Sequence, residues 1–103
     1  MIEFFIPATV SQIIVYSRHI DPRWGPERLR NLCEQELDVR LEPATAVLFH
    51  NRAQDTLILV AQDDDGDRTV TKRLERGAFL LPAPDPGRGY ATVRPSQMNS
   101  LFR

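Results

Sequence analysis

Positive side chains and one tryptophan are the residues of this chain whose chemistry could serve binding. Between an apolar run and a helical pattern lie Arg18, His19, Arg23 and Trp24. An aromatic ring among arginines before a helix could hold a phosphate or stack on a nucleic-acid base. Alternatively, Trp24 is a hydrophobic plug over the first helical turn and the arginines are solvated. Two further arginines follow on the expected helix: Arg28 and Arg30.

A second basic group surrounds Gly77. Its members are Lys72, Arg73, Arg76 and Arg88. Strand alternation places Val70, Lys72 and Leu74 on one face of a strand. A lysine between two apolar residues either extends along an edge to reach water or points toward a partner.

Acidic and metal-binding chemistry is poorly supported by the residue spacing. When Gly66 is aligned with the glycine of an EF-hand loop, Ala61 falls at the first ligand position and Lys72 at the last. The aspartates of segment 63–67 therefore indicate a solvated turn. His19 and His50 have no partner at metal-ligand spacing.

Nucleophilic catalysis is also poorly supported. Cys33 with His19 or His50 could form a nucleophilic pair, but this cysteine falls on the apolar stripe of the expected helix. A buried structural thiol is the ordinary outcome there. No phosphate-binding loop, serine-hydrolase elbow or zinc-protease motif occurs in the sequence. We therefore expect no enzyme activity, no metal and no cofactor.

Charge composition allows two interpretations. The 103 residues carry 13 basic and 14 acidic side chains, for a net charge of −1, which argues against a uniformly basic DNA-coating protein. Lys72 is the only lysine, so the other 12 basic residues are arginines. Arginine suits bidentate contacts to phosphate or guanine, but a GC-rich genome that favours arginine codons explains the same bias.

Compartment signals point to the cytoplasm. No apolar run approaches the roughly 20 residues that a membrane-spanning helix needs. The first ten residues contain Glu3 and no basic region before the apolar stretch, so they predict a strand rather than a signal peptide. Cys33 has no cysteine to pair with inside the chain.

Hydrophobic periodicity predicts one α+β domain over residues 1–103, with a meander of an antiparallel sheet and one main helix packed on it. The helix is expected at 25–38, because Leu29, Leu32, Cys33 and Leu37 form one stripe. Pro26 suits its first turn, and Asp21 or Gly25 could cap it. The remaining elements are strands at 2–6, 12–16, 46–50, 56–62 and 68–74, a short strand at 90–93, and a short C-terminal helix from 95 that carries Met98, Leu101 and Phe102.

Four stretches resemble the TnpB accessory proteins of the insertion sequence 66 family. Residues 21–25 (DPRWG) resemble its D-x-R-x-G segment, and residues 46–51 (AVLFHN) resemble its L-F-x-F-x-N strand. Residues 55–60 resemble the following strand, and residues 65–82 contain KRLERGAF, which resembles the block K-R-L-E-x-G-x-F-x-x-P. The chain departs from the family pattern at Ile20, Trp24 and Ile58.

This resemblance implies a non-catalytic, auxiliary role in bacterial transposition beside a separate transposase. The leading hypothesis is an adaptor that binds transposon-end DNA, the transposase or both. Its expected contact residues are Arg18, Arg23, Trp24, Lys72, Arg73 and Arg76. The alternative is a protein-interaction module, such as a homodimer that pairs through segments 2–6 and 78–82.

Overall fold

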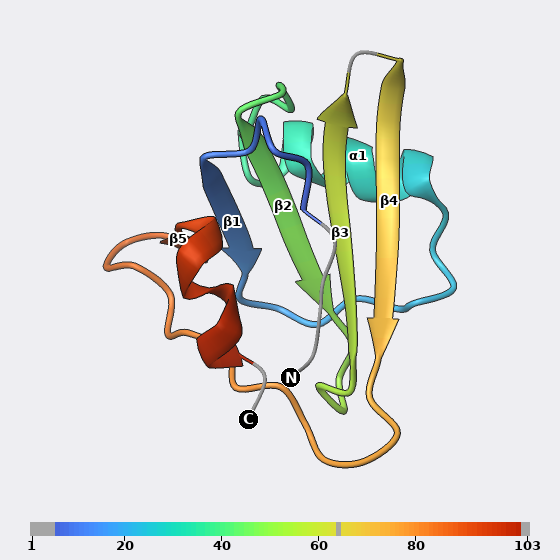
Figure 1. Ribbon diagram of the computed structural model, residues 1–103, viewed down its shortest axis with the longest axis vertical. Helices are drawn as coiled ribbons and strands as arrows, with labels where there is room; N and C mark the ends of the chain where they lie inside the picture. Colours follow the sequence, from blue (N-terminus) through green and yellow to red (C-terminus); the bar gives the residue numbers. More distant parts are fainter. Residues whose placement is uncertain (1–5, 64, 102–103) are drawn as a thin grey trace.

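Three inner strands of mostly apolar residues and two edge strands form a five-stranded sheet in the order β4-β3-β2-β1-β5 (Figure 1). The computed structural model describes residues 6–63 and 65–101. The elements are β1 (Gln12–Tyr16), α1 (Pro26–Gln35), β2 (Thr45–His50), β3 (Thr56–Asp63), β4 (Gly66–Arg73), β5 (Tyr90–Val93) and the 3-10 helix η1 (Pro95–Leu101).

The expected α+β class is confirmed, with one main helix on a mostly antiparallel sheet. The meander β2–β3–β4 lies where the alternating runs predicted it. Helix α1 is shorter than the predicted 25–38, with Gly25 as its N-cap and Pro26 in its first turn. The C-terminal helix is of the 3-10 type. Phe102 and all of segment 2–6 except Ile6 lie outside the described residues.

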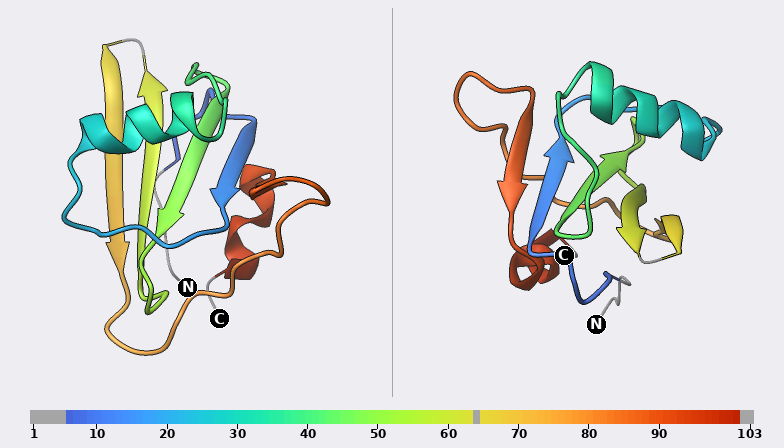
Figure 2. Two further views of the ribbon diagram at one scale, coloured as in Figure 1. Left: turned by 180° about the vertical axis from the view of Figure 1, so that it is seen from behind. Right: turned by 90° about the horizontal axis from the view of Figure 1, so that it is seen from above.

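One strand pair is parallel, a feature that the sequence patterns did not indicate. Strands β1 and β2 lie side by side, with Gln12 opposite Thr45 and Val15 opposite Leu48. The chain passes between them through α1, which lies across one face of the sheet, so the unit is a right-handed crossover (Figure 2). As a result, the C-terminal residues of β1 and β2 lie at the same end of the sheet.

Both faces of the inner strands β1, β2 and β3 are buried, because successive side chains of each strand point alternately into two cores. The helix-side core joins α1 to residues such as Val47, Phe49 and Ile58. The second core, on the opposite face, includes Leu48 and Leu57 and has no α-helix over it. Three residues from loops and from η1 belong to this second core: Val10, Phe79 and Met98.

The segment after β4 closes the second core. Gly77 has φ +78°, a conformation that other residues rarely adopt, and it bends the chain back toward the sheet. Phe79 is 1% exposed, and Leu81 packs beside it. Leu80 lies between these two residues but is 55% exposed, because alternate side chains of this extended segment point in opposite directions. Segment 78–82 thus covers the domain's own core and forms no strand.

We expect Phe79→Ala to lower the free energy of unfolding by about 3–5 kcal/mol, since it removes a buried ring and leaves a cavity. Leu80→Ala is the matched control and should change it by less than about 0.5 kcal/mol. Urea unfolding followed by circular dichroism measures both. Equal effects of the two substitutions would contradict the assigned orientation of this segment.

Candidate nucleic-acid interface

Residues 21–25 form a turn that leads directly into α1. The backbone N–H of Trp24 donates to the carbonyl oxygen of Asp21 at 2.9 Å, with Pro22 at the position that proline favours in such turns. The Asp21 carboxylate also accepts the Arg23 backbone N–H at 2.9 Å. Its two oxygens hold the Arg23 guanidinium through Nε and through Nη2, the latter at 2.8 Å. Asp21 therefore shapes the turn and fixes the arginine.

The turn between β2 and β3 is organised by Asn51. Its Oδ1 accepts the backbone N–H groups of Asp55 and Thr56, both at 3.1 Å, and its Nδ2 donates to the Asp55 carboxylate at 2.6 Å. The Asn51 amide, the Thr56 hydroxyl and the charge of Arg73 lower the pKa of Asp55. This last contribution places Arg73, at the end of β4, near the same turn.

Two distant segments bind the backbone of residues 50–55. Ile20 donates its N–H to the carbonyl of His50 at 2.8 Å, which attaches the connection between β1 and α1. Leu74 donates to the carbonyl of Asp55, and Phe79 to that of Gln54, both at 2.7 Å. Residues 17–25, 51–55 and 72–79 therefore meet at one end of the sheet.

His50 adds a side-chain link at this end. Its Nε2 lies 2.9 Å from the carbonyl oxygen of Tyr16, the last residue of β1. Its Nδ1 lies 3.2 Å from the carbonyl oxygen of Asn51. Because a carbonyl only accepts hydrogen bonds, the tautomer with hydrogen on Nε2 satisfies the shorter contact. The buried imidazole ties the ends of the two parallel strands together, so His50 has a structural role.

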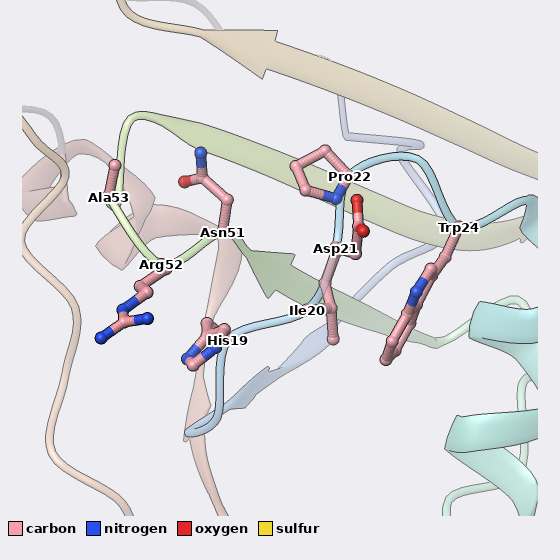
Figure 3. Close-up of a pocket in the computed structure, with 8 residues that line it drawn as sticks. All are labelled: His19, Ile20, Asp21, Pro22, Trp24, Asn51, Arg52 and Ala53. Atoms are coloured by element: carbon pink, nitrogen blue, oxygen red, sulfur yellow. The ribbon is translucent and has the colours of Figure 1, made fainter.

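An open pocket of about 590 Å³ lies between the first two of these segments (Figure 3). We call it the Trp24 pocket. The indole of Trp24 stands at one side of the pocket, and Arg52 and His19 lie at the other. The lining residues are His19, Ile20, Asp21, Pro22, Trp24, Asn51, Arg52 and Ala53.

Trp24 has two contacts that bear on its role. It is half-buried and packs against the helix-side core, as the plug interpretation predicted. The guanidinium carbon of Arg28 lies 3.8 Å from the ring centroid, close enough for a cation–π interaction. Trp24 also lines a second hollow beside Arg28 and Leu32. The side chain is thus a core residue whose ring also forms a wall of the Trp24 pocket.

Several arginines of the two basic groups already have partners. Arg23 is held by Asp21, and Arg28 lies on Trp24. Arg30 contacts Asp67 of β4 and lies 3.6 Å from Glu34, so it stabilises the packing of α1. Arg88 lies 5.5 Å from the ring centroid of Tyr90 in β5. It is therefore away from the Gly77 bend, although its sequence position placed it in the same basic group.

The other expected residues lie around the end where the segments meet. Arg73 and Arg76 are exposed, and Lys72 is half-buried opposite Leu57. The side chain of Lys72 lies on the same face of the sheet as the second core. This agrees with the expectation that its aliphatic stem packs on the sheet while its ammonium group reaches water. Arg18 borders a separate hollow beside Tyr16 and Glu36.

Arg52 is a candidate residue that the sequence patterns did not single out. It is exposed, lines the Trp24 pocket and has no ion-pair or hydrogen-bond partner among the described residues. The sequence placed it in a turn, where a solvated arginine is unremarkable. Its position directly after Asn51, the last residue of a family-like strand pattern, was the available signal.

Nucleophilic catalysis and a metal site, which the sequence did not predict, gain no support from the described residues. Cys33 is 0% exposed in the helix-side core, and its burial raises the pKa of the thiol to about 12. A nucleophilic Cys33 would need access to substrate. Among the described residues, no three His, Cys, Asp or Glu side chains gather as a metal site. The same residues contain no helix long and apolar enough to cross a bilayer.

The sequence as a whole matches one family model. That model is described as IS66 Orf2 like protein and matches residues 11–103. The chain therefore belongs to the IS66 Orf2 like family, which associates it with an insertion sequence. No curated protein matches the chain. No solved structure matches it either.

The clamp on Arg23 predicts a measurable change in the titration of Asp21. Its hydrogen bonds to the Arg23 side chain, and then to the Arg23 backbone, lower the pKa of Asp21 from 3.8 to about 2. In Arg23→Gln the pKa should rise toward 3.8, stopping short because the backbone bond remains. Carbon-13 NMR of the carboxyl group measures it. Because the folded-state pKa is lowered, the pair stabilises the fold above pH 3.8 and ceases to do so as pH falls toward 2.

Arg76→Gln serves as the control for this titration and should leave the pKa of Asp21 unchanged. If the pKa of Asp21 stays near 2 in Arg23→Gln, the side-chain clamp is not the dominant cause.

Burial of Cys33 predicts slow reaction of its thiol. With Ellman's reagent at neutral pH, the folded protein should release thionitrobenzoate only at the rate at which the domain opens, whereas the urea-unfolded chain should react at once. Reaction of the native protein as fast as that of the unfolded chain would contradict the enclosed position and reopen a catalytic role for Cys33.

Proposed function

We propose that this protein is a non-catalytic accessory protein of transposition that acts in the bacterial cytoplasm. In this proposal it binds transposon-end DNA, the separate transposase or both. The supporting observation is the meeting of three distant segments at one end of the sheet, the end at which β1 and β2 finish. The first two of these segments, 17–25 and 51–55, line the open Trp24 pocket.

Charge is unevenly placed along the molecule, and this supports an anionic partner. Segments 17–25, 51–55 and 72–77 contain six arginine or lysine side chains against three acidic ones. At the opposite end, the described part of the β3–β4 connection contains the acidic residues Asp65 and Asp67. A net charge of −1 therefore hides a basic end and an acidic end, and such a field orients a charged partner.

The proposed contacts use the basic end. Arg73 and Arg76 are exposed there, and the half-buried Lys72 adds its ammonium group. A guanidinium has five N–H donors, so Arg23 retains donors for a phosphate while Asp21 holds it in place. The full set proposed is Arg18, Arg23, Trp24, Lys72, Arg73 and Arg76.

A gel-shift assay with duplex DNA of the element's own ends, with and without the transposase, tests this proposal over a salt series. We expect Arg73→Gln/Arg76→Gln to weaken binding, because fewer phosphates are then neutralised by the protein. The slope of log affinity against log salt should become shallower by about 0.9 for each such phosphate. Arg40→Gln/Arg94→Gln removes two exposed arginines from the opposite end and should leave the slope unchanged.

The two formats separate the parts of the proposal. A shift that appears only with transposase supports the adaptor role. No shift at low salt in either format removes the DNA-binding part. If light scattering then shows a stable dimer that binds neither DNA nor transposase, the protein is a homodimeric interaction module and the proposed function is wrong.

A further inference from the structure

We propose that the Trp24 pocket receives one unpaired nucleotide, with its base against the indole and its phosphate beside Arg52 and His19. This inference deepens the proposed function and rests on the DNA-binding part of it. It identifies a site within the basic end and the chemical class that this site takes.

The pocket has two chemically different sides. The indole of Trp24 stands at one side, next to Ile20, while Arg52 and His19 lie across from it (Figure 3). A ligand that uses both sides needs a flat apolar body joined to an anionic group. A nucleotide has this composition. The volume of about 590 Å³ also lies within the range of pockets that hold small ligands.

The indole is prepared for stacking on one side only. Arg28 lies 3.8 Å from the ring centroid, and the hollow that it shares with Trp24 lies on the α1 side. Packing against the helix-side core then limits movement of the ring. A base that stacks on a ring already held in place loses little affinity to ordering of the side chain, and one base–aromatic stack contributes substantially to binding.

Some polar groups that line the pocket already have hydrogen-bond or ion-pair partners within the domain, and others do not. The Asp21 carboxylate is occupied by Arg23, and both ends of the Asn51 amide serve the β2–β3 turn. Arg52 and His19 are exposed and have no hydrogen-bond or ion-pair partner among the described residues. Arg52 therefore offers free donors, the His19 ring offers an N–H, and the one carboxylate of the lining is balanced by a guanidinium. This arrangement favours an anion and disfavours a cationic ligand.

An unpaired nucleotide fits better than a paired one. Within a duplex both faces of a base are covered by its neighbours, so an indole reaches a base face only after the base has left the stack. The donors on the far side would then contact its phosphate, because phosphate oxygens are the common acceptors for arginine.

Trp24 is the only tryptophan, so its fluorescence reports directly on the pocket. The probe is an oligothymidylate of eight nucleotides, compared with a blunt-ended duplex at equal nucleotide concentration. We expect saturable quenching by the single strand and much weaker quenching by the duplex. Arg52→Gln should weaken binding of the single strand about tenfold. It should also lower the salt slope by about 0.7, the value for one phosphate contact in single strands.

Arg40→Gln removes an exposed arginine at the opposite end and should match the wild type in both measurements. Trp24→Leu, with binding followed by anisotropy of labelled oligothymidylate, should lose affinity while its circular dichroism spectrum stays folded. Wild-type affinity in folded Trp24→Leu would overturn the inference.

Failure of this inference is distinguishable from failure of the proposed function. If duplex ends still shift in gels but the oligothymidylate does not quench Trp24, the pocket takes no nucleotide and the proposed function stands. If neither DNA binds, the DNA-binding part of the proposed function falls and this inference falls with it. Quenching by a phosphotyrosine peptide that outcompetes the oligothymidylate would assign the pocket to a protein partner and overturn the inference.

Discussion

The hydrogen bonds of Asn51 are the interaction on which one end of this domain depends. A turn between buried strands leaves backbone N–H groups that are costly to bury without partners. The Asn51 side chain accepts two of them and donates to Asp55, so one amide replaces the backbone partners that the turn lacks. This network holds Gln54 at φ +59°, an unusual conformation for a residue with a side chain. The carbonyl groups of the turn are then free to accept bonds from elsewhere.

Those carbonyl groups explain why distant parts of the sequence meet. Gln54 accepts the N–H of Phe79 and Asp55 accepts that of Leu74, so the chain leaving β4 is attached before its aromatic ring enters the second core. The neighbouring carbonyl of His50 holds Ile20 and with it the turn that precedes α1. Residues that look like separate signatures along the chain are thus parts of one structure. The Trp24 pocket is the space left where the Ile20 segment and the β2–β3 turn face each other.

Local patterns predicted local structure well and long-range arrangement poorly. The apolar stripe of α1 and the alternation in the meander are properties of a few adjacent residues, and both lie where they were expected. The parallel pairing of β1 with β2 depends on the crossover through α1, which no short pattern encodes. The same reason explains Arg52, which lines a pocket only because the Ile20 segment approaches the β2–β3 turn from elsewhere in the sequence. Arg88 was grouped by sequence position with residues that the fold places apart.

The partners of the arginines sharpen what the composition implied. A strong excess of arginine over lysine did not distinguish codon usage from anion binding. In the fold, Arg23 and Arg30 pair with carboxylates and Arg28 lies on an indole, uses that exploit the planar guanidinium within the domain. These pairs account for part of the arginine bias without any external ligand. The argument for an anionic partner therefore rests on exposed cations such as Arg52 and Arg76, whose charges no carboxylate of the described residues neutralises by direct contact.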